Sequence, residues 1–248
     1  LQQANLNLIN IRGDQTINLD GLVTLGTLNI GDTSGQNSYV IAAGTGGSLA
    51  FSGGGAAALN KTGTGTDVIS SNITLTDTTT ITVSDGILAL TGVISGSGTG
   101  IIKEGDGMLI LRGSNTYTGA NILNGGTTFL VPTVNDGAVL GSTAGSTTVN
   151  NGATLAFGPD ALGSGGIGNP AEPVTINGRG FRNNGALRFF MGVNSMTFNG
   201  PVTMGSAAQI QADVVGTLTL SGAINVNQDL RVGGAGHAVG QVVLHEPL

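Results

Sequence analysis

Short runs of alternating or continuous apolar residues recur about every ten residues along the chain, and polar, glycine-containing segments separate them. Residues 87–90 (ILAL), 108–111 (MLIL) and 217–220 (TLTL) are typical of these runs. Their length fits half-buried or buried β-strands and is too short for helices. Asn-Gly and Asp-Gly pairs, which adopt positive φ angles readily, stand between many of the runs and mark turns. The pattern therefore predicts an all-β protein built from many short strands.

The turn spacing by itself allows three architectures: a barrel of hairpins, a sandwich or a solenoid. Internal similarity favours the solenoid, because residues 72–94 and 201–224 align with one extra residue in the second copy. Each coil of a solenoid buries its apolar side only against a similar neighbour, which explains the repetition. We predict one domain, residues 1–248, folded as a right-handed parallel β-helix (a β-solenoid) of about ten to twelve coils. Aliphatic side chains should point inward, and Thr, Ser, Asn and Gln outward.

Composition supports an ordered β-protein. Glycine supplies 45 of the 248 residues, and charged residues make up 9%, where roughly 25% is usual for a globular domain. Lys, Glu and Arg are strong helix formers, so their scarcity disfavours helices. Hydrophobic residues make up 39% of the chain, which argues against intrinsic disorder. The chain has no cysteine, which excludes disulfides and thiolate metal sites.

The charge pattern bears on partners. The net charge is −6, and the eight Lys and Arg residues are widely scattered. A nucleic-acid-binding protein gathers such residues on one face, so we expect no nucleic-acid partner. The only local basic group is Arg179, Arg182 and Arg188, which we interpret as solvated turn residues. No run of about 18 apolar residues exists, and we expect no insertion of this segment into a membrane.

One segment carries a family pattern. Residues 98–130 read GTGIIKEGDGMLILRGSNTYTGANILNGGTTFL, with a lysine after an apolar pair, alternating leucines, a Gly-x-Asn-Thr-Tyr-x-Gly stretch and an Asn-Gly-Gly turn. The segment resembles the autotransporter-associated β-strand repeat, found in passenger regions of bacterial autotransporters. The positions that define the repeat here are Gly105, Gly107, Leu109, Leu111, Gly113, Asn115, Tyr117, Gly119, Asn124 and Gly125. The resemblance implies a right-handed parallel β-helix on the outside of a Gram-negative-type cell.

The function predicted from this resemblance is a non-enzymatic, structural or adhesive stalk of a bacterial surface or secreted protein, without a cofactor. Host cells, neighbouring cells or glycans are the partners that it implies. A first alternative is a filament or sheath subunit that associates end to end, because neither end of the sequence shows a helix or a charged cap. A second is a glycan-active enzyme, which needs clustered acids and bases. Glu104 and Asp106 form the closest carboxylate pair, and His237 and His245 lie in no catalytic motif.

Three short motifs are weaker signals. Arg12-Gly13-Asp14 matches the tripeptide that integrins read and is a candidate adhesive site, although a simple turn explains it as well. Residues 63–69 partly match a calcium-binding nonapeptide, but no tandem copy follows to complete the site. Threonine alternates at positions 74, 76, 78, 80 and 82. On one strand these side chains would share one face, which we interpret as an ordinary solvated face.

Overall fold

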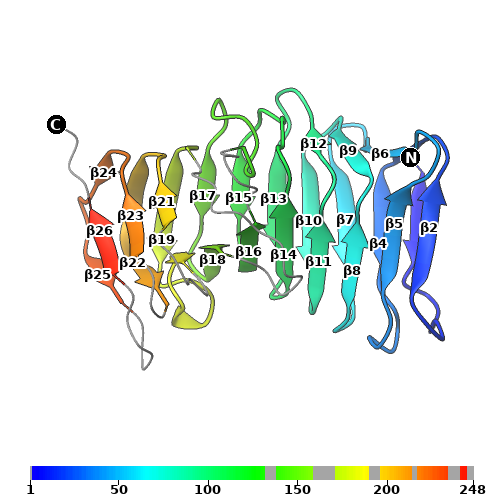
Figure 1. Ribbon diagram of the computed structural model, residues 1–248, viewed down its shortest axis with the longest axis horizontal. Helices are drawn as coiled ribbons and strands as arrows, with labels where there is room; N and C mark the ends of the chain where they lie inside the picture. The colour runs from blue at the N-terminus through cyan, green and yellow to red at the C-terminus, as the bar shows by residue number, and fades with distance from the viewer. Residues whose placement is uncertain are drawn as a thin grey trace.

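The computed structural model describes residues 2–131, 138–158, 171–189, 196–213, 217–233 and 241–244. The chain winds as a β-solenoid, with successive coils stacked side by side along the long axis from the N-terminal to the C-terminal end (Figure 1). Each coil contributes strands to up to three ladders, and every pairing among the described strands is parallel. The predicted all-β, parallel solenoid is confirmed.

The first ladder extends through the whole described stack. It pairs strands of successive coils in register, starting with Gln3 opposite Thr27 and ending with Val202 opposite Ile224. Its strands are β1 (Gln3–Leu6), β4 (Thr27–Ile30), β7 (Ala57–Lys61), β10 (Thr79–Val83), β13 (Ile101–Glu104), β15 (Asn121–Leu123), β17 (Thr147–Val149), β19 (Val174–Gly178), the first part of β22 (Val202–Ala212) and β24 (Ile224–Asn225).

The second ladder lies next to the first on each coil, and also extends along the whole stack. Its strands are β2 (Gln15–Leu19), β5 (Tyr39–Ala43), β8 (Thr66–Ile69), β11 (Ile87–Leu90), β14 (Met108–Arg112), β16 (Gly126–Val131), β18 (Ala153–Phe157), β20 (Leu187–Phe189), the second part of β22 and β25 (Leu230–Val232). A short 3₁₀ helix, η1 (Phe181–Asn183), precedes β20. None of the described helices is long and apolar enough to cross a membrane.

The third ladder contains regular strands only near the two ends of the solenoid. Its strands are β3 (Leu22–Leu25), β6 (Ser48–Phe51), β9 (Asn72–Leu75) and β12 (Ile94–Ser95), and then β21 (Met196–Phe198), β23 (Thr217–Leu220) and β26 (Gln241–Leu244). Between these two groups, backbone hydrogen bonds continue the stacking: Thr116 donates to the Ile94 carbonyl at 2.8 Å, and Ser142 to the Tyr117 carbonyl at 2.8 Å.

The solenoid makes about nine turns, fewer than the ten to twelve that we predicted. The reason is coil length, which varies more than the assumed 20–25 residues. Asn60 and its stacked partner Asn29 lie 31 residues apart, whereas Asn124 and Glu104 lie 20 apart. The longer coils carry extended corners, which a strand pattern does not reveal. The right-handed winding stays a prediction.

The interior is one continuous hydrophobic cluster that extends from Ile11 in the first coil to Leu220 near the last. Inward positions alternate along the strands, as predicted, and are mostly Leu, Ile and Val. Aromatic side chains contribute to this core, and the rings of Phe157 and Phe198 lie 5.6 Å apart in its C-terminal half. Because each coil buries its apolar side only against its neighbours, the stability of each coil depends on the next.

The outward face of the second ladder differs from the expected polar surface. Val68, Ala89, Ile110, Phe129 and Ala156 stand opposite one another on five successive coils. All but Val68 are buried, and together they belong to a second hydrophobic cluster outside the main core. The alternating pattern predicts which residues share a face, but it does not determine whether that face is covered.

Two interpretations of local pattern are corrected by the coil geometry. The alternating threonines do not share one strand, because β9 ends at Leu75 and β10 begins at Thr79, with a corner between them. The two similar segments also start on different faces: Ile73 belongs to the third ladder, whereas its aligned partner Val202 belongs to the first. The similarity thus reflects the shared order of strands and turns rather than equivalent positions in a coil.

Candidate functional site

The family-like segment forms the middle of the solenoid, where β13 and β14 are followed by β15 and β16 on the next coil. Its leucines Leu109 and Leu111 point into the core, and Tyr117 is fully buried. Asn115 connects three coils: its Oδ1 accepts the N–H of Ile94 at 2.8 Å, and its Nδ2 donates to the carbonyl of Val139 at 2.7 Å. Asn115 therefore supplies hydrogen bonds to backbone groups that have no partner in a neighbouring strand.

Glycines of the segment lie where neighbouring coils approach closely. Gly105 has a φ of 79°, and a Cβ there would lie 2.4 Å from the carbonyl oxygen of Val83. At Gly119 a Cβ would lie 2.3 Å from the carbonyl carbon of Thr99, although its backbone conformation is ordinary. Gly107, Gly113 and Gly125 occupy other corners of the same two coils. The coils can approach this closely at Gly105 and Gly119 because glycine has no side chain.

Asn124 belongs to a row of stacked polar side chains at the end of the first ladder. Its Nδ2 donates to Glu104 Oε1 at 2.6 Å, and its Oδ1 accepts Asn150 Nδ2 at 2.7 Å. The same arrangement links Asn5, Asn29 and Asn60, with distances of 2.7 and 2.8 Å. Glu104 is therefore engaged in stacking the coils, which argues against the acid–base pair that we considered for Glu104 and Asp106.

Lys103 is buried at the corner between two coils, which the sequence did not indicate. Its ammonium group donates to the carbonyls of Glu104 and Gly105, both at 2.8 Å, and to that of Gly125 on the next coil at 3.3 Å. Burial lowers the pKa of Lys103 to about 8, against the opposing effect of the carboxylates of Glu104 and Asp106. One side chain thus closes a turn and links it to its neighbour.

Replacing Lys103 by Met is expected to destabilise this corner by about 2 kcal/mol, because three partly buried carbonyls would lose their donor. Hydrogen exchange of residues 104–125 and urea unfolding followed by circular dichroism measure the effect. Ile102→Met, on the adjacent and partly exposed position, is the control. An equal effect of both substitutions would show that the ammonium group makes no special contribution.

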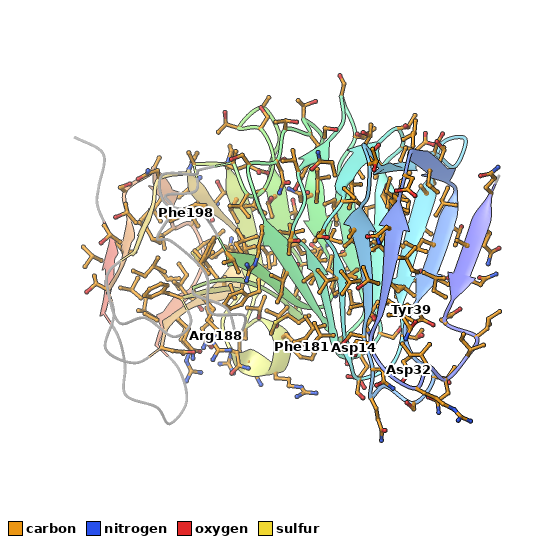
Figure 2. The ribbon with its side chains drawn as sticks, turned by 45° about the vertical axis from the view of Figure 1, so that its right-hand side comes forward. Asp14, Asp32, Tyr39, Phe181, Arg188 and Phe198 are labelled. Atoms are coloured by element: carbon orange, nitrogen blue, oxygen red, sulfur yellow. The ribbon has the colours of Figure 1, made fainter. Side chains whose placement is uncertain are left out.

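The basic residues that we interpreted as solvated turn residues lie at one corner of the C-terminal coils. Figure 2 shows Phe181 and Arg188 close together at this corner. The interpretation is wrong for Arg188, which belongs to β20 and forms an ion pair with Asp213, with Nε–Oδ2 at 2.7 Å. Arg182 lies over the ring of Phe181, 4.9 Å from its centroid. Two of the three arginines therefore have partners within the fold.

Arg179 lines a groove at the same corner, together with Arg231 from a later coil. We call this site the arginine groove; it has a volume of about 220 Å³ and is lined by Arg179, Ala207, Ala208, Asp229, Leu230 and Arg231. The strand register brings these lining residues together, because Gly178, Ala208 and Leu230 stand opposite one another on three successive coils. Sequence analysis missed Arg231 because 52 residues separate it from Arg179.

Comparison with protein families assigns the central segment. Residues 101–128 match the family model of the passenger-associated-transport-repeat. This confirms the resemblance that the sequence indicated for residues 98–130. No curated protein and no solved structure matches the chain. The passenger repeat thus covers β13, β14, β15 and part of β16, and the family suggests a secreted or cell-surface location.

Outside the passenger repeat, the partial calcium motif has a different role in the fold. Its aspartate, Asp67, points into the core, where Oδ2 lies 3.3 Å from Lys61 Nζ and Oδ1 accepts the N–H of Tyr39 at 2.6 Å. Lys61 also donates to the carbonyls of Thr62 and Gly63, at 2.7 and 2.6 Å. Burial raises the pKa of Asp67, and the N–H of Tyr39 and the ammonium of Lys61 oppose that shift.

A second buried polar cluster joins the end of the passenger repeat to the coils that follow it. Glu172 Oε1 accepts the hydroxyl of Thr147 at 2.9 Å, and Asn121 Nδ2 donates to Thr147 Oγ1 at 3.0 Å. Among the described residues, Glu172 Oε2, Asn121 Oδ1 and the hydroxyl of the nearby Tyr117 have no hydrogen-bond partner. Burial raises the pKa of Glu172 to about 7, and the hydroxyl of Thr147 and the side-chain amide of Asn121 oppose that shift.

The candidate adhesive tripeptide Arg12-Gly13-Asp14 lies in the corner between β1 and β2 of the first coil. The side chain of Arg12 is exposed, whereas Asp14 Oδ1 accepts the N–H of Ser38 from the second coil at 2.8 Å. Figure 2 shows Asp14 and Asp32 at this corner. Asp32 fixes Ile11, the residue before the tripeptide, because its Oδ1 accepts the N–H of Ile11 at 3.0 Å. The corner is thus fixed on both sides of the tripeptide.

Asp32 holds its own loop as well. Its carboxylate accepts the hydroxyl of Ser34 and the N–H groups of Gln36 and Asn37, the last two at 3.1 and 3.3 Å. The hydrogen bond from Ser34, together with those from the backbone, lowers the pKa of Asp32 to about 2 against the effect of burial. Its carboxylate is therefore charged at every pH at which the protein is expected to work.

The structure describes only some of the residues considered for catalysis. His237 and His245 lie outside the described residues. Within the described ranges, no three His, Cys, Asp or Glu side chains form a group that could hold a metal ion. The buried lysines, the Glu172 cluster and the arginine groove are the features that sequence analysis missed. Lys103 has a fixed place in the family pattern, but that pattern did not indicate that the side chain is buried.

Proposed function

We propose that this chain is a non-enzymatic, extracellular structural segment of a bacterial surface or secreted protein, shaped as a stiff passenger-like stalk. The observation that carries the proposal is the uninterrupted pair of parallel ladders from β1 to β24 and from β2 to β25, with a passenger repeat at their centre. A solenoid of this kind transmits its rigidity from coil to coil, because each coil is held by both neighbours.

The use of polar side chains supports this proposal. Asn115, Asn124, Lys103 and Asp32 each bond to a neighbouring coil. Side chains that would be free for chemistry in an enzyme are thus used here for the stacking itself. We infer that the segment holds other parts of a surface protein, or a bound partner, at a distance from the cell.

Small-angle scattering and atomic force microscopy of the purified chain test the stalk. Ten stacked strands at about 4.8 Å spacing give a rod on the order of 45 Å long. We expect an elongated particle whose cross-section stays constant along its length, compared with a globular protein of equal mass as the control. A compact, spherical particle would refute the stalk.

End-to-end association, the alternative that the sequence raised, remains a prediction. Large apolar side chains are exposed on the coils at both ends of the described stack, including Leu22 at one end and Val232 at the other. Unpaired strand edges with apolar side chains favour pairing with another copy. Light scattering over a range of concentrations distinguishes the two cases: a growing mass supports association, and a constant monomer mass contradicts it.

A further inference from the structure

We propose that the arginine groove binds an acidic saccharide, with the sugar carboxylate held between the guanidinium groups of Arg179 and Arg231. The groove is a hollow of about 220 Å³ on the outside of the C-terminal coils. This role goes beyond that of a stalk, since a rod can hold its shape with or without a ligand at this corner.

The charge of the groove is the first argument. Within the described part of the chain, neither the side chain of Arg179 nor that of Arg231 has a hydrogen-bond or ion-pair partner. The neighbouring Arg188 and Arg182, in contrast, are engaged by Asp213 and Phe181. Two unpaired guanidinium groups therefore line one groove in a chain of net charge −6. Guanidinium groups bind carboxylates through paired, charge-assisted hydrogen bonds, so an anionic group is the ligand that this pair fits.

The spacing of the coils is the second argument. Arg179 follows Gly178 on one coil, and Arg231 follows Leu230 two coils later. Two strand spacings place these backbones on the order of 10 Å apart. The coil between them contributes Ala207, which is exposed and small, and Ala208, which is buried in the main core. One ligand of the size of a sugar ring can therefore contact both arginines.

The remaining lining residues distinguish a sugar from a simple anion. Ala207, Ala208 and Leu230 provide an apolar floor, which suits the C–H face of a sugar ring. Asp229 provides an exposed carboxylate, which accepts hydrogen bonds from sugar hydroxyls. A phosphate or sulfate ion offers neither an apolar face for this floor nor the several hydroxyl groups of a sugar for Asp229. A carboxylate-bearing sugar matches all three parts of the groove.

Calorimetric and NMR titration of the full chain test the proposal with three probes: a tetrasaccharide of alternating glucuronate and N-acetylglucosamine, an N-acetylglucosamine tetrasaccharide, and inorganic phosphate. We expect the acidic tetrasaccharide to bind, with chemical-shift changes at residues 207–208 and 229–231, and the other two to bind at least tenfold more weakly. Equal affinity for the neutral sugar, or for phosphate, would overturn the proposal, as would the absence of any binding.

Variants separate the groove from general charge effects. Arg179→Ala combined with Arg231→Ala should weaken binding of the acidic sugar about 10- to 100-fold, because charged hydrogen bonds are lost. Arg182→Ala, which removes an exposed arginine that lies over Phe181 and outside the groove lining, is the control and should have no effect. Asp229→Ala should weaken binding of the acidic sugar but not of phosphate. An equal loss with Arg182→Ala would overturn the proposal. Scattering of each variant shows separately whether the stalk itself is intact.

Discussion

Asp67→Asn is expected to lower the free energy of unfolding by about 3 kcal/mol, because it leaves the buried ammonium of Lys61 without a counter-charge. Both side chains are 1% exposed, and Asp67 Oδ2 lies 3.3 Å from Lys61 Nζ. Asparagine keeps the size of the side chain and an oxygen that accepts the N–H of Tyr39, so the loss reports the charge. Urea unfolding followed by circular dichroism measures it, and hydrogen exchange shows whether the second to fourth coils open first.

A double-mutant cycle isolates the contribution of this ion pair. Lys61→Met by itself leaves Asp67 buried without its partner, and the double variant removes both charges. We expect the double variant to be more stable than the sum of the single losses implies, with a coupling energy of about 2 kcal/mol. Strictly additive losses would show that the two groups act independently, and would refute the pair as a stabilising contact.

Stability is expected to fall as the pH rises from about 4.5 to 7, because of Glu172. Its pKa is raised from 4.5 to about 7 by burial, so between these values the folded chain holds a proton that the unfolded chain releases. Stability then decreases with rising pH through this window and becomes level above it. At 1.36 kcal/mol for each pKa unit, the whole change is about 3 kcal/mol. Unfolding midpoints in urea at pH 5 and pH 8 measure it.

Glu172→Gln is the matched control for this pH dependence. Glutamine keeps the shape and one acceptor for the hydroxyl of Thr147, but it stays neutral at every pH. We expect this variant to lose the decline in stability between pH 5 and pH 8, while other titrating groups affect both proteins equally. Asp32 does not interfere, because its pKa of about 2 lies below this range. The same pH slope in both proteins would assign the decline to another group.

The sequence by itself determined the class of the fold. Alternating residues fix which side chains share a face, and runs such as residues 87–90 lie in strands as expected. The internal similarity then favoured a solenoid, because each coil buries its apolar side only against a similar neighbouring coil. The passenger repeat was visible because glycines such as Gly105 and Gly119, and Asn115, are needed at fixed corners; a Cβ at either glycine would lie less than 3 Å from the backbone of a neighbouring coil.

Tertiary structure alone decided which residues meet between coils. Lys61 and Lys103 follow strand patterns like any exposed lysine, yet both lie inside, because backbone carbonyls at the corners need donors there. The arginine groove also depends on coil length, since one more residue between Arg179 and Arg231 would change their register. The separation between paired residues of neighbouring coils varies, from 19 residues between Met108 and Thr127 to 32 between Leu155 and Leu187. The local sequence pattern does not give the length of each coil, so only the tertiary structure shows which residues meet.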